Sequence, residues 1–168
     1  DMGGAAKDFY ERGIELSFEQ WGAGSAAEYI ADNTSVPGTY TDPSGSNTYT
    51  EALSSITIAW DEAATTAQKQ ERIITQKWIA NWLLGNEAWA DWRRTGYPTL
   101  IPVSDAGNKS NGIVDSRQGA RRMAYPTNEV TSNSENYQAA VSNLLKGADN
   151  MTTRLWFDCN PDNPYYKN

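Results

Sequence analysis

The stretch that decides the fold is residues 65–94, with the sequence TTAQKQERIITQKWIANWLLGNEAWADWRR. Apolar residues recur in it every three or four positions, which predicts two helices that each carry an apolar face. Thr65 and Gln68 form the pattern of a capping box, so we expect the first helix to begin there. Gly85 is expected to end that helix, and Asn86 is expected to cap the second. The stretch therefore predicts a helical hairpin.

Four tryptophans fall at helical spacing along this hairpin. Side chains in such a stripe belong to a core more often than to a ligand site, so we predict that all four pack inside the protein. Ile, Leu, Val and Phe make up only 25 of the 168 residues, which leaves little aliphatic surface to cover the indole rings. We therefore expect part of this aromatic surface to be covered by chain that lies outside these residues. The four are Trp78, Trp82, Trp89 and Trp92.

Three more helices are expected outside the hairpin. Residues 5–21 place large apolar side chains four, four and three positions apart, and Gly22 follows them as a helix stop. A short helix is expected over residues 25–31. Ser132 and Glu135 repeat the capping-box pattern and precede the apolar residues of a last helix.

The remainder of the chain is predicted to be rich in loops. Residues 33–50 are mostly Gly, Pro, Ser, Thr, Asn and Tyr, and residues 97–131 show no long periodicity. Short strands fit around residues 54–60, 100–103 and 122–125. The predicted fold class is therefore mostly α, with long loops and few short strands, and the length suits a single unit.

Composition excludes several classes of function. The chain has no His, which removes Ser-His-Asp and Cys-His catalysis and nearly every catalytic zinc site. Cys159 is the single cysteine, so an internal disulfide and a multi-cysteine metal site are both excluded. A net charge of −7 argues against binding to nucleic acid. No apolar run approaches the roughly 18 residues of a membrane span. We expect neither a cofactor nor a metal ion.

Acidic residues supply possible catalytic pairs, as a glycosidase would need. Such an enzyme places two carboxylates about 5–10 Å apart across a cleft. Asp61 and Glu62 are adjacent, and Glu87 and Asp91 lie four positions apart. Among 21 acidic residues such pairs are inevitable, and no nucleophile, base and orienting group can be assembled around them. We therefore predict a protein that is not an enzyme. The polar residues of 105–115 do not match the calcium-loop pattern.

Two arginine pairs, Arg93–Arg94 and Arg121–Arg122, have the chemistry to grip a carboxylate or phosphate. Cations near helix C-termini are also a routine stabilising feature, and we favour this second interpretation. The pairs are then expected to tie the loop of residues 97–131 to helix ends by satisfying main-chain carbonyls. The acidic partners expected for them are Asp91, Asp115 and Glu129.

Tyr40 and Tyr49 are the candidate ligand-binding residues. They lie in a predicted loop, where side chains are more often exposed and functional. Sugars present flat faces of C–H groups, which aromatic rings cover while nearby polar groups bind the hydroxyls. A tyrosine ring can equally pin a loop to the surface beneath it, and the sequence leaves both roles open.

Several motifs occur together in one order along the chain. The most specific is NEAWADWRRTGYP at residues 86–98, and IITQKW precedes it at residues 73–78. The weaker pieces are SFEQW at 17–21, ITIAW at 56–60, RR to YP at 121–126, GADN at 147–150 and TRLWFD at 153–158. Together they resemble the C-terminal part of SusD/RagB-type outer-membrane lipoproteins, and the resemblance covers nearly the whole chain.

This resemblance implies a tetratricopeptide-like helical scaffold with long loops, anchored outside the cell by a lipidated N-terminal cysteine. Members of the family are considerably longer than 168 residues. Residues 1–168 are therefore expected to be the C-terminal segment of a larger protein, without its N-terminal helical region and its lipid anchor. Cys159 lies near the other end of the chain and cannot be that anchor.

The function implied by the resemblance is non-catalytic binding of a glycan or other nutrient at the extracellular face of the outer membrane. The ligand would pass to a SusC-like TonB-dependent transporter, which is the expected protein partner. One alternative is a structural segment that supports a ligand site and a transporter interface located elsewhere in the protein. A glycoside hydrolase is the less favoured alternative.

Overall fold

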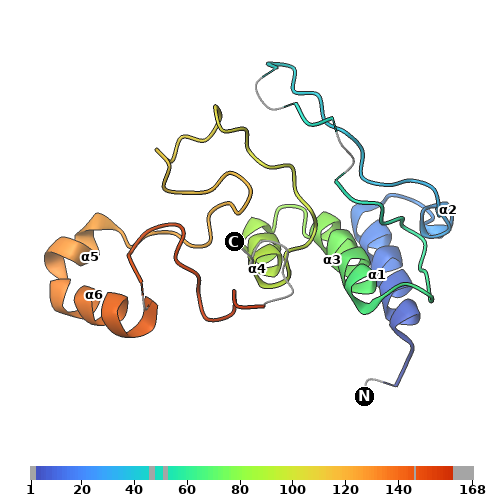
Figure 1. The fold of residues 1–168 in the computed structure, drawn as a ribbon. Coiled ribbons are helices and arrows are strands. Elements are labelled where there is room, and N and C mark those ends of the chain that lie inside the picture. Colours follow the sequence, from blue (N-terminus) through green and yellow to red (C-terminus); the bar gives the residue numbers. More distant parts are fainter. Residues whose placement is uncertain (1–2, 46–47, 51–52, 146, 161–168) are drawn as a thin grey trace. The chain divides into compact units, whose positions relative to one another are not determined.

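The computed structural model of the chain describes residues 3–45, 48–50, 53–145 and 147–160. Its regular secondary structure is helical, which confirms the predicted fold class (Figure 1). The chain divides into two compact units. Unit 1 comprises Asp1–Tyr40, Tyr49–Trp92 and Tyr97–Leu100, and unit 2 comprises Thr41–Thr48, Arg93–Gly96 and Ile101–Asn168.

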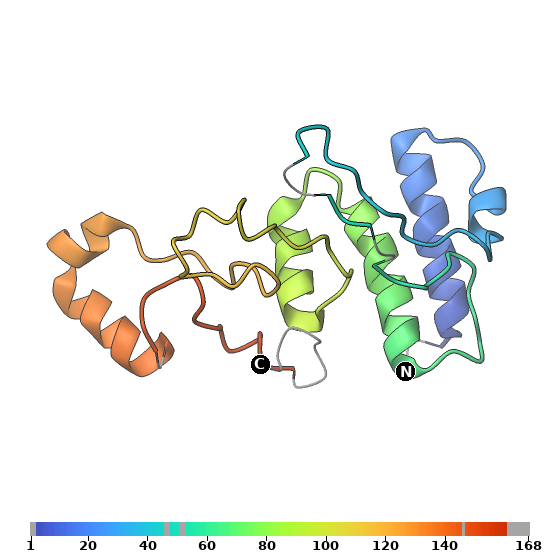
Figure 2. The ribbon, with the colours of Figure 1, turned by 45° about the horizontal axis from the view of Figure 1, so that its top comes forward.

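Unit 1 is built on helices α1 (Ala6–Trp21), α2 (Ala27–Ile30) and α3 (Thr66–Ala80). Helices α1 and α3 lie side by side (Figure 2). Helix α4 (Gly85–Thr95) begins in unit 1, and its last turn belongs to unit 2. The predicted helix over residues 25–31 is confirmed in shortened form as α2.

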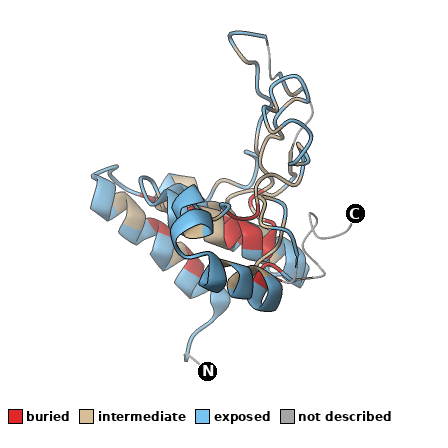
Figure 3. Ribbon diagram, turned by 90° about the vertical axis from the view of Figure 1, so that its left-hand side faces the viewer, coloured by how far each residue is buried: buried red, intermediate tan, exposed pale blue. Residues whose placement is uncertain are grey.

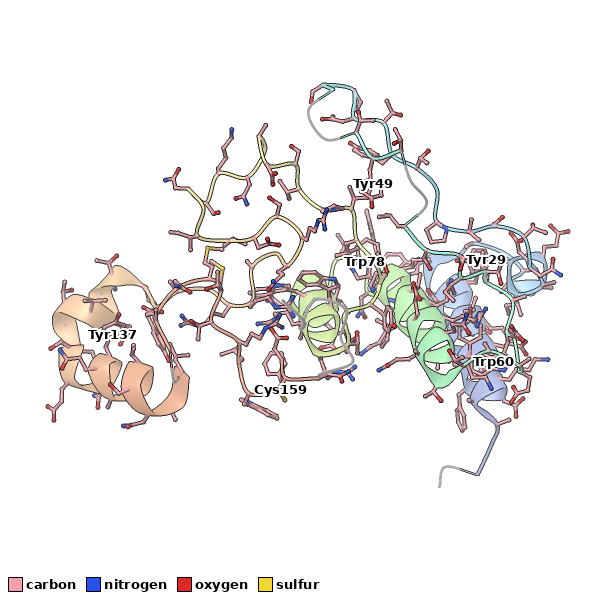
Figure 4. The ribbon with its side chains drawn as sticks, viewed as in Figure 1. Tyr29, Tyr49, Trp60, Trp78, Tyr137 and Cys159 are labelled. Atoms are coloured by element: carbon pink, nitrogen blue, oxygen red, sulfur yellow. The ribbon has the colours of Figure 1, made fainter. Side chains whose placement is uncertain are left out.

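The apolar stripe of α1 forms the core of unit 1. Tyr10 and Ile14 are buried, and Trp21 at the end of the stripe is exposed. The ring of Trp60, which is labelled in Figure 4, packs on this core, and its centroid lies 5.3 Å from that of the Tyr10 ring. Helix α1 ends as predicted at Gly22, whose φ of 65° is the left-handed conformation that glycine adopts without a steric penalty. The cluster is completed by Ala26, Phe18, Tyr29 and Ile30.

Helix α3 begins as predicted. The Thr65 hydroxyl accepts a hydrogen bond from the Gln68 amide at 3.3 Å, and the Gln68 side chain accepts one from the Thr65 amide at 3.0 Å. The predicted end of the helix is wrong, because α3 stops at Ala80 and Gly85 begins α4.

The chain turns between α3 and α4 at residues 81–84. The amide of Leu84 donates to the carbonyl of Asn81 at 2.8 Å, and Leu83 takes the positive φ of 70° that the turn requires. A left-handed conformation costs a branched residue roughly 1–2 kcal/mol, which is why glycine is the expected residue at such a turn. Because Leu83 makes this turn, Gly85 is left to start α4, and Asn86 lies inside the helix.

The strand predicted over residues 54–60 is not formed. The backbone of this segment is bound by side chains and by a loop instead of by a neighbouring strand. The Tyr10 hydroxyl donates to the Ile58 carbonyl at 2.6 Å, and Arg72 Nε donates to the Thr57 carbonyl at 3.0 Å. Alternating isoleucines therefore mark a segment packed on helices, with no sheet beneath it.

Unit 2 contains α5 (Thr127–Ser132), α6 (Ser134–Ala140) and a π-helical turn at Val141–Leu145. The last predicted helix is confirmed as α6, but the predicted capping box is not formed. Helix α6 begins at Ser134 after Asn133, and Ser132 ends α5, a helix that the sequence does not predict. The strands predicted at residues 100–103 and 122–125 are also wrong, since neither segment is a strand.

Arg121 and Asp158 form a buried ion pair in unit 2. Arg121 Nε and Nη2 donate to the two carboxylate oxygens of Asp158 at 2.6 and 2.7 Å. Arg121 Nη2 also donates to the Arg93 carbonyl at 3.0 Å, and Arg93 Nη1 donates to the Arg121 carbonyl at 2.7 Å. Arg154 Nη1 binds the same carboxylate at 2.7 Å. The predicted role of Arg93 and Arg121 as ties between loop and helix end is confirmed, and Arg121 pairs with Asp158, which is not among the predicted acidic partners.

Arg122, the second residue of the Arg121–Arg122 pair, forms an ion pair with Asp149. Arg122 Nη1 donates to Asp149 Oδ1, and the amide of Tyr125 donates to the same oxygen at 3.1 Å. Burial opposes ionisation of Asp149, but these hydrogen bonds outweigh it, so its pKa lies below the ordinary aspartate value. Asp149 also replaces the acidic partners that the sequence predicts.

Buried positions occupy short stretches of the chain, and much of the helical surface is exposed (Figure 3). The largest fully buried side chains are Arg121, Thr95 and Asp158, all of unit 2. No helix among the described residues combines the length and apolar character needed to cross a membrane.

Replacement of Asp158 by alanine is expected to destabilise the protein by about 3–5 kcal/mol, because it leaves Arg121 buried without its counter-charge. Asp105 offers a matched control, since it is exposed and its side chain accepts one hydrogen bond, from Ser116. Urea denaturation followed by circular dichroism measures both variants. Equal losses for Asp158→Ala and Asp105→Ala would contradict the role given to the buried pair.

Asp149→Asn is expected to weaken the dependence of stability on acidic pH. A carboxyl whose folded pKa is depressed contributes stability that is complete above its unfolded pKa and is lost as pH falls through the folded pKa. The unfolding free energy should therefore fall below about pH 4, and it should fall less steeply in Asp149→Asn. Denaturation midpoints measured from pH 6 to pH 2 test this, and identical slopes would argue against it.

Candidate ligand-binding surface

Unit 1 carries three hollows on its surface. The first, of about 330 Å³, is named here the Arg72 pocket and lies between α3, residues 56–58 and residues 98–100. The second, of about 480 Å³, runs between α1 and α3. The third, of about 550 Å³, is named the tryptophan groove and follows the end of α3 into α4. Trp78 and Ile79 line both the Arg72 pocket and the tryptophan groove.

The Arg72 pocket combines apolar walls with a few polar groups. Ile56, Ile58 and Trp78 contribute apolar surface. Tyr29 and Gln76 add hydroxyl and amide groups, and the Tyr29 hydroxyl donates to Gln76 Oε1 at 2.9 Å. A concave, mostly apolar surface with a small number of fixed polar groups is typical of sites for small ligands.

Arg72 lies in the wall of this pocket and is 4% exposed. Helix α3 places it one turn before Thr75 and Gln76 and two turns before Ile79, so the four residues share one helix face. All four line the pocket. The sequence shows the i, i+3, i+4, i+7 spacing of these four residues. The stripe of tryptophans draws attention away from it, and Arg72 is not among the site residues predicted from the sequence.

The tryptophan groove exposes part of the indole surface that the sequence assigns to the core. Trp92 is buried at 7% exposure, and Trp89 is half-buried. Trp78 is 43% exposed and Trp82 is 68% exposed, so the packing predicted for these two is wrong within this structure. Trp82 precedes the left-handed Leu83 in the turn between the helices, which carries both side chains to the surface.

Tyr40 and Tyr49, the predicted ligand residues, are brought together by the structure. Their main chains form an isolated antiparallel bridge, with the two N–H···O distances at 2.8 and 2.7 Å. Tyr40 is 40% exposed, and Tyr49 is half-buried. Because the bridge uses backbone atoms alone, both phenol rings remain available for other contacts.

Lysines bind three of the four carboxylates in the possible catalytic pairs, those of Glu62, Glu87 and Asp91. Lys77 Nζ lies 3.0 Å from Glu87 and 2.6 Å from Asp91. The hydrogen bond with Asp91 is the largest cause of a raised Lys77 pKa. Glu62 accepts hydrogen bonds from Trp60 Nε1 and from Lys69.

The polar residues of 105–115 act within their own turns. Asn108 Nδ2 donates to the Val114 carbonyl at 2.6 Å, and Asp115 Oδ1 accepts from the amides of residues 117 and 118. Across the described part of the chain, no group of three or more acidic, cysteine or histidine side chains is arranged to hold a metal ion.

The different exposures of the tryptophans predict different costs of truncation. Trp92→Ala is expected to cost about 3–5 kcal/mol of unfolding free energy, the usual range for a large buried ring. Trp82→Ala is expected to change it by about 0.5 kcal/mol or less, as for other exposed positions. Urea denaturation of the two variants gives the comparison. A Trp82→Ala loss as large as that of Trp92→Ala would show that the Trp82 ring is packed.

Three solved structures that are similar to this chain are SusD homologues. A homologue from Bacteroides uniformis is 62% identical over 94% of this chain, with a TM-score of 0.89. A chitin-binding homologue from Flavobacterium johnsoniae is 45% identical over 97%, also at 0.89. A SusD-like protein from Bacteroides thetaiotaomicron is 43% identical over 97%, at 0.86. The chain spans 32%, 33% and 34% of these three structures.

No curated protein matches the chain. The family model of the SusD and RagB outer-membrane lipoproteins matches residues 1–158. None of these descriptions names an enzyme. The family match covers nearly all of the sequence, and the helical fold agrees with that of the solved homologues at 62% identity. The chain therefore belongs to the SusD-like family of outer-membrane lipoproteins.

Proposed function

We propose that this chain contributes to holding a glycan at the cell surface, without making or breaking a bond in it. The observation that carries this proposal is the Arg72 pocket, where the exposed Trp78 ring stands beside the polar groups of Tyr29, Thr75 and Gln76. An aromatic face covers the C–H groups of a sugar ring, and neighbouring hydroxyl and amide groups bind its hydroxyls. The 45% identical homologue that binds chitin supports a glycan as the ligand.

Tyr40 and Tyr49 belong to the same proposal as ligand residues. Their backbone bridge holds the two residues opposite each other, so each ring needs little further ordering to meet a sugar. The half-exposed state of Tyr40 leaves one face for such a contact.

The protein is proposed to act at the extracellular face of the outer membrane as a lipoprotein. Its protein partner is proposed to be a SusC-like TonB-dependent transporter, to which it delivers the glycan. The family description supports the membrane location.

A second candidate role is structural, and one observation favours it. Trp82, Leu83 and Leu84 are 68%, 82% and 59% exposed in one turn, a larger apolar surface than a connecting turn needs. The chain also spans about a third of the solved homologues. In this role residues 1–168 form the C-terminal segment of a longer protein, whose other helices cover the tryptophan groove and carry the ligand site.

Retardation in native gels containing single polysaccharides tests the first proposal. At least one polysaccharide is expected to slow the migration of the protein. Tyr40→Ala or Tyr49→Ala is expected to weaken that binding about threefold to tenfold, because each change removes one ring contact. The backbone bridge survives both changes, so the loop stays closed. Trp156→Ala is the matched control, because it removes an aromatic ring that is 87% exposed in unit 2.

Two results would contradict the proposal. The absence of retardation by every polysaccharide would favour the structural role, whereas binding that is unchanged in both tyrosine variants would remove only the tyrosines from the site. Release of reducing sugar from a bound polysaccharide, abolished by changing one carboxylate, would make the protein a hydrolase.

A further inference from the structure

Arg72 is a buried cation with one hydrogen bond. Its Nε donates to the Thr57 carbonyl at 3.0 Å, and its Nη1 is buried with no hydrogen-bond partner among the described residues. A guanidinium has five N–H donors, and a buried charge is costly unless it is paired and hydrogen-bonded. Because Nε is already engaged, the Nη1–Nη2 edge is the one left for a bidentate contact.

No carboxylate of the described residues forms an ion pair or a hydrogen bond with Arg72. Among the described residues that line the pocket, Arg72 is the one that carries a charge at neutral pH. The neighbouring Glu71 is used elsewhere, since its Oε1 accepts from the Ser54 hydroxyl at 2.6 Å and from the Thr99 hydroxyl at 3.5 Å. Burial raises the pKa of Tyr10 far above its ordinary value, more than nearby Arg72 lowers it, so this phenol stays neutral.

The pocket is therefore a locally positive site on a chain whose net charge is −7. A neutral sugar would meet the apolar wall of Ile56, Ile58 and Trp78 but would leave the charge of Arg72 uncompensated. A carboxylate matches the guanidinium edge in geometry and in charge, and charge-assisted pairs of this kind are the stronger hydrogen bonds. The ligand that fits both features is a sugar ring that bears a carboxylate.

We propose that the Arg72 pocket binds the carboxylate of a uronic-acid residue in an acidic glycan. The proposal rests on the glycan binding proposed above and adds the chemical class of the glycan. In the complex, the Nη1–Nη2 edge of Arg72 donates to the two carboxylate oxygens. Trp78 covers a C–H face of the ring, and the Gln76 amide and the Thr75 hydroxyl meet its hydroxyls.

Calorimetric titration of the full chain tests this with trimers of galacturonic, glucuronic, mannuronic and guluronic acid. Each trimer is compared with its carboxyl-reduced counterpart, which keeps the ring and linkage but has no charge. At least one acidic trimer is expected to bind about tenfold to a hundredfold more tightly than its neutral form, the range of one charge-assisted contact. Equal affinities within every pair would overturn the proposal.

Arg72→Gln is expected to remove the preference for the acidic trimer over its neutral counterpart. Arg117→Gln makes the same change of charge at an exposed residue of unit 2 and is expected to keep the preference. A preference that survives in Arg72→Gln, or that is lost in Arg117→Gln, would place the recognition elsewhere and overturn the proposal.

Val36→Asp decides the matter if Arg72→Gln fails to fold. Val36 lines the pocket, is 44% exposed and has no assigned contact in the proposed complex, so the new carboxylate opposes a bound acid without removing a sugar contact. Loss of acidic binding with neutral binding retained supports the proposal, and an unchanged preference overturns it. If no trimer and no polysaccharide binds the unaltered chain, the proposed function itself fails. Binding of neutral glycans without an acidic preference refutes the Arg72 proposal alone.

Discussion

The candidate ligand surface depends on residues 54–60, whose backbone carbonyls accept hydrogen bonds from side chains because no neighbouring strand is present. Two side chains from different helices do this work: Tyr10 of α1 binds the Ile58 carbonyl, and Arg72 of α3 binds the Thr57 carbonyl. Buried carbonyls must find partners, so a segment without a neighbouring strand stays on the helices only while these donors are present. The segment in turn supplies one wall of the pocket. These hydrogen bonds therefore join the core of unit 1, the segment of residues 54–60 and the candidate ligand surface.

Two buried arginines show opposite solutions to the same electrostatic problem. Arg121 in unit 2 donates to both carboxylate oxygens of Asp158 and to two main-chain carbonyls. Arg72 in unit 1 has one carbonyl partner and borders a hollow. A saturated charge holds a fold together, whereas an unsaturated one makes its site selective for an anion. The same residue type thus serves structure in one unit and, in our proposal, recognition in the other.

The sequence predicted those features that local chemistry determines. The cap at Thr65 and the left-handed stop at Gly22 depend on neighbouring residues, and both were found where expected. The end of α3 was missed because Leu83 adopts a conformation that its own residue type disfavours. The segment 54–60 was misread as a strand because its true partners lie 15 and 48 residues away in the sequence. The loop position of Tyr40 and Tyr49 is predictable from composition, but the missing ion-pair partner of Arg72 becomes visible only when its neighbours are placed in space.

The turn between α3 and α4 also has a consequence for handling the protein. It presents Trp82, Leu83 and Leu84 to water in the four-residue connection between two helices. A short apolar ridge between two helices has fewer backbone conformations to lose on contact than a long loop would have. A sample of this chain at high concentration should therefore associate with itself through the ridge, reversibly and more strongly as salt screens its negative charge.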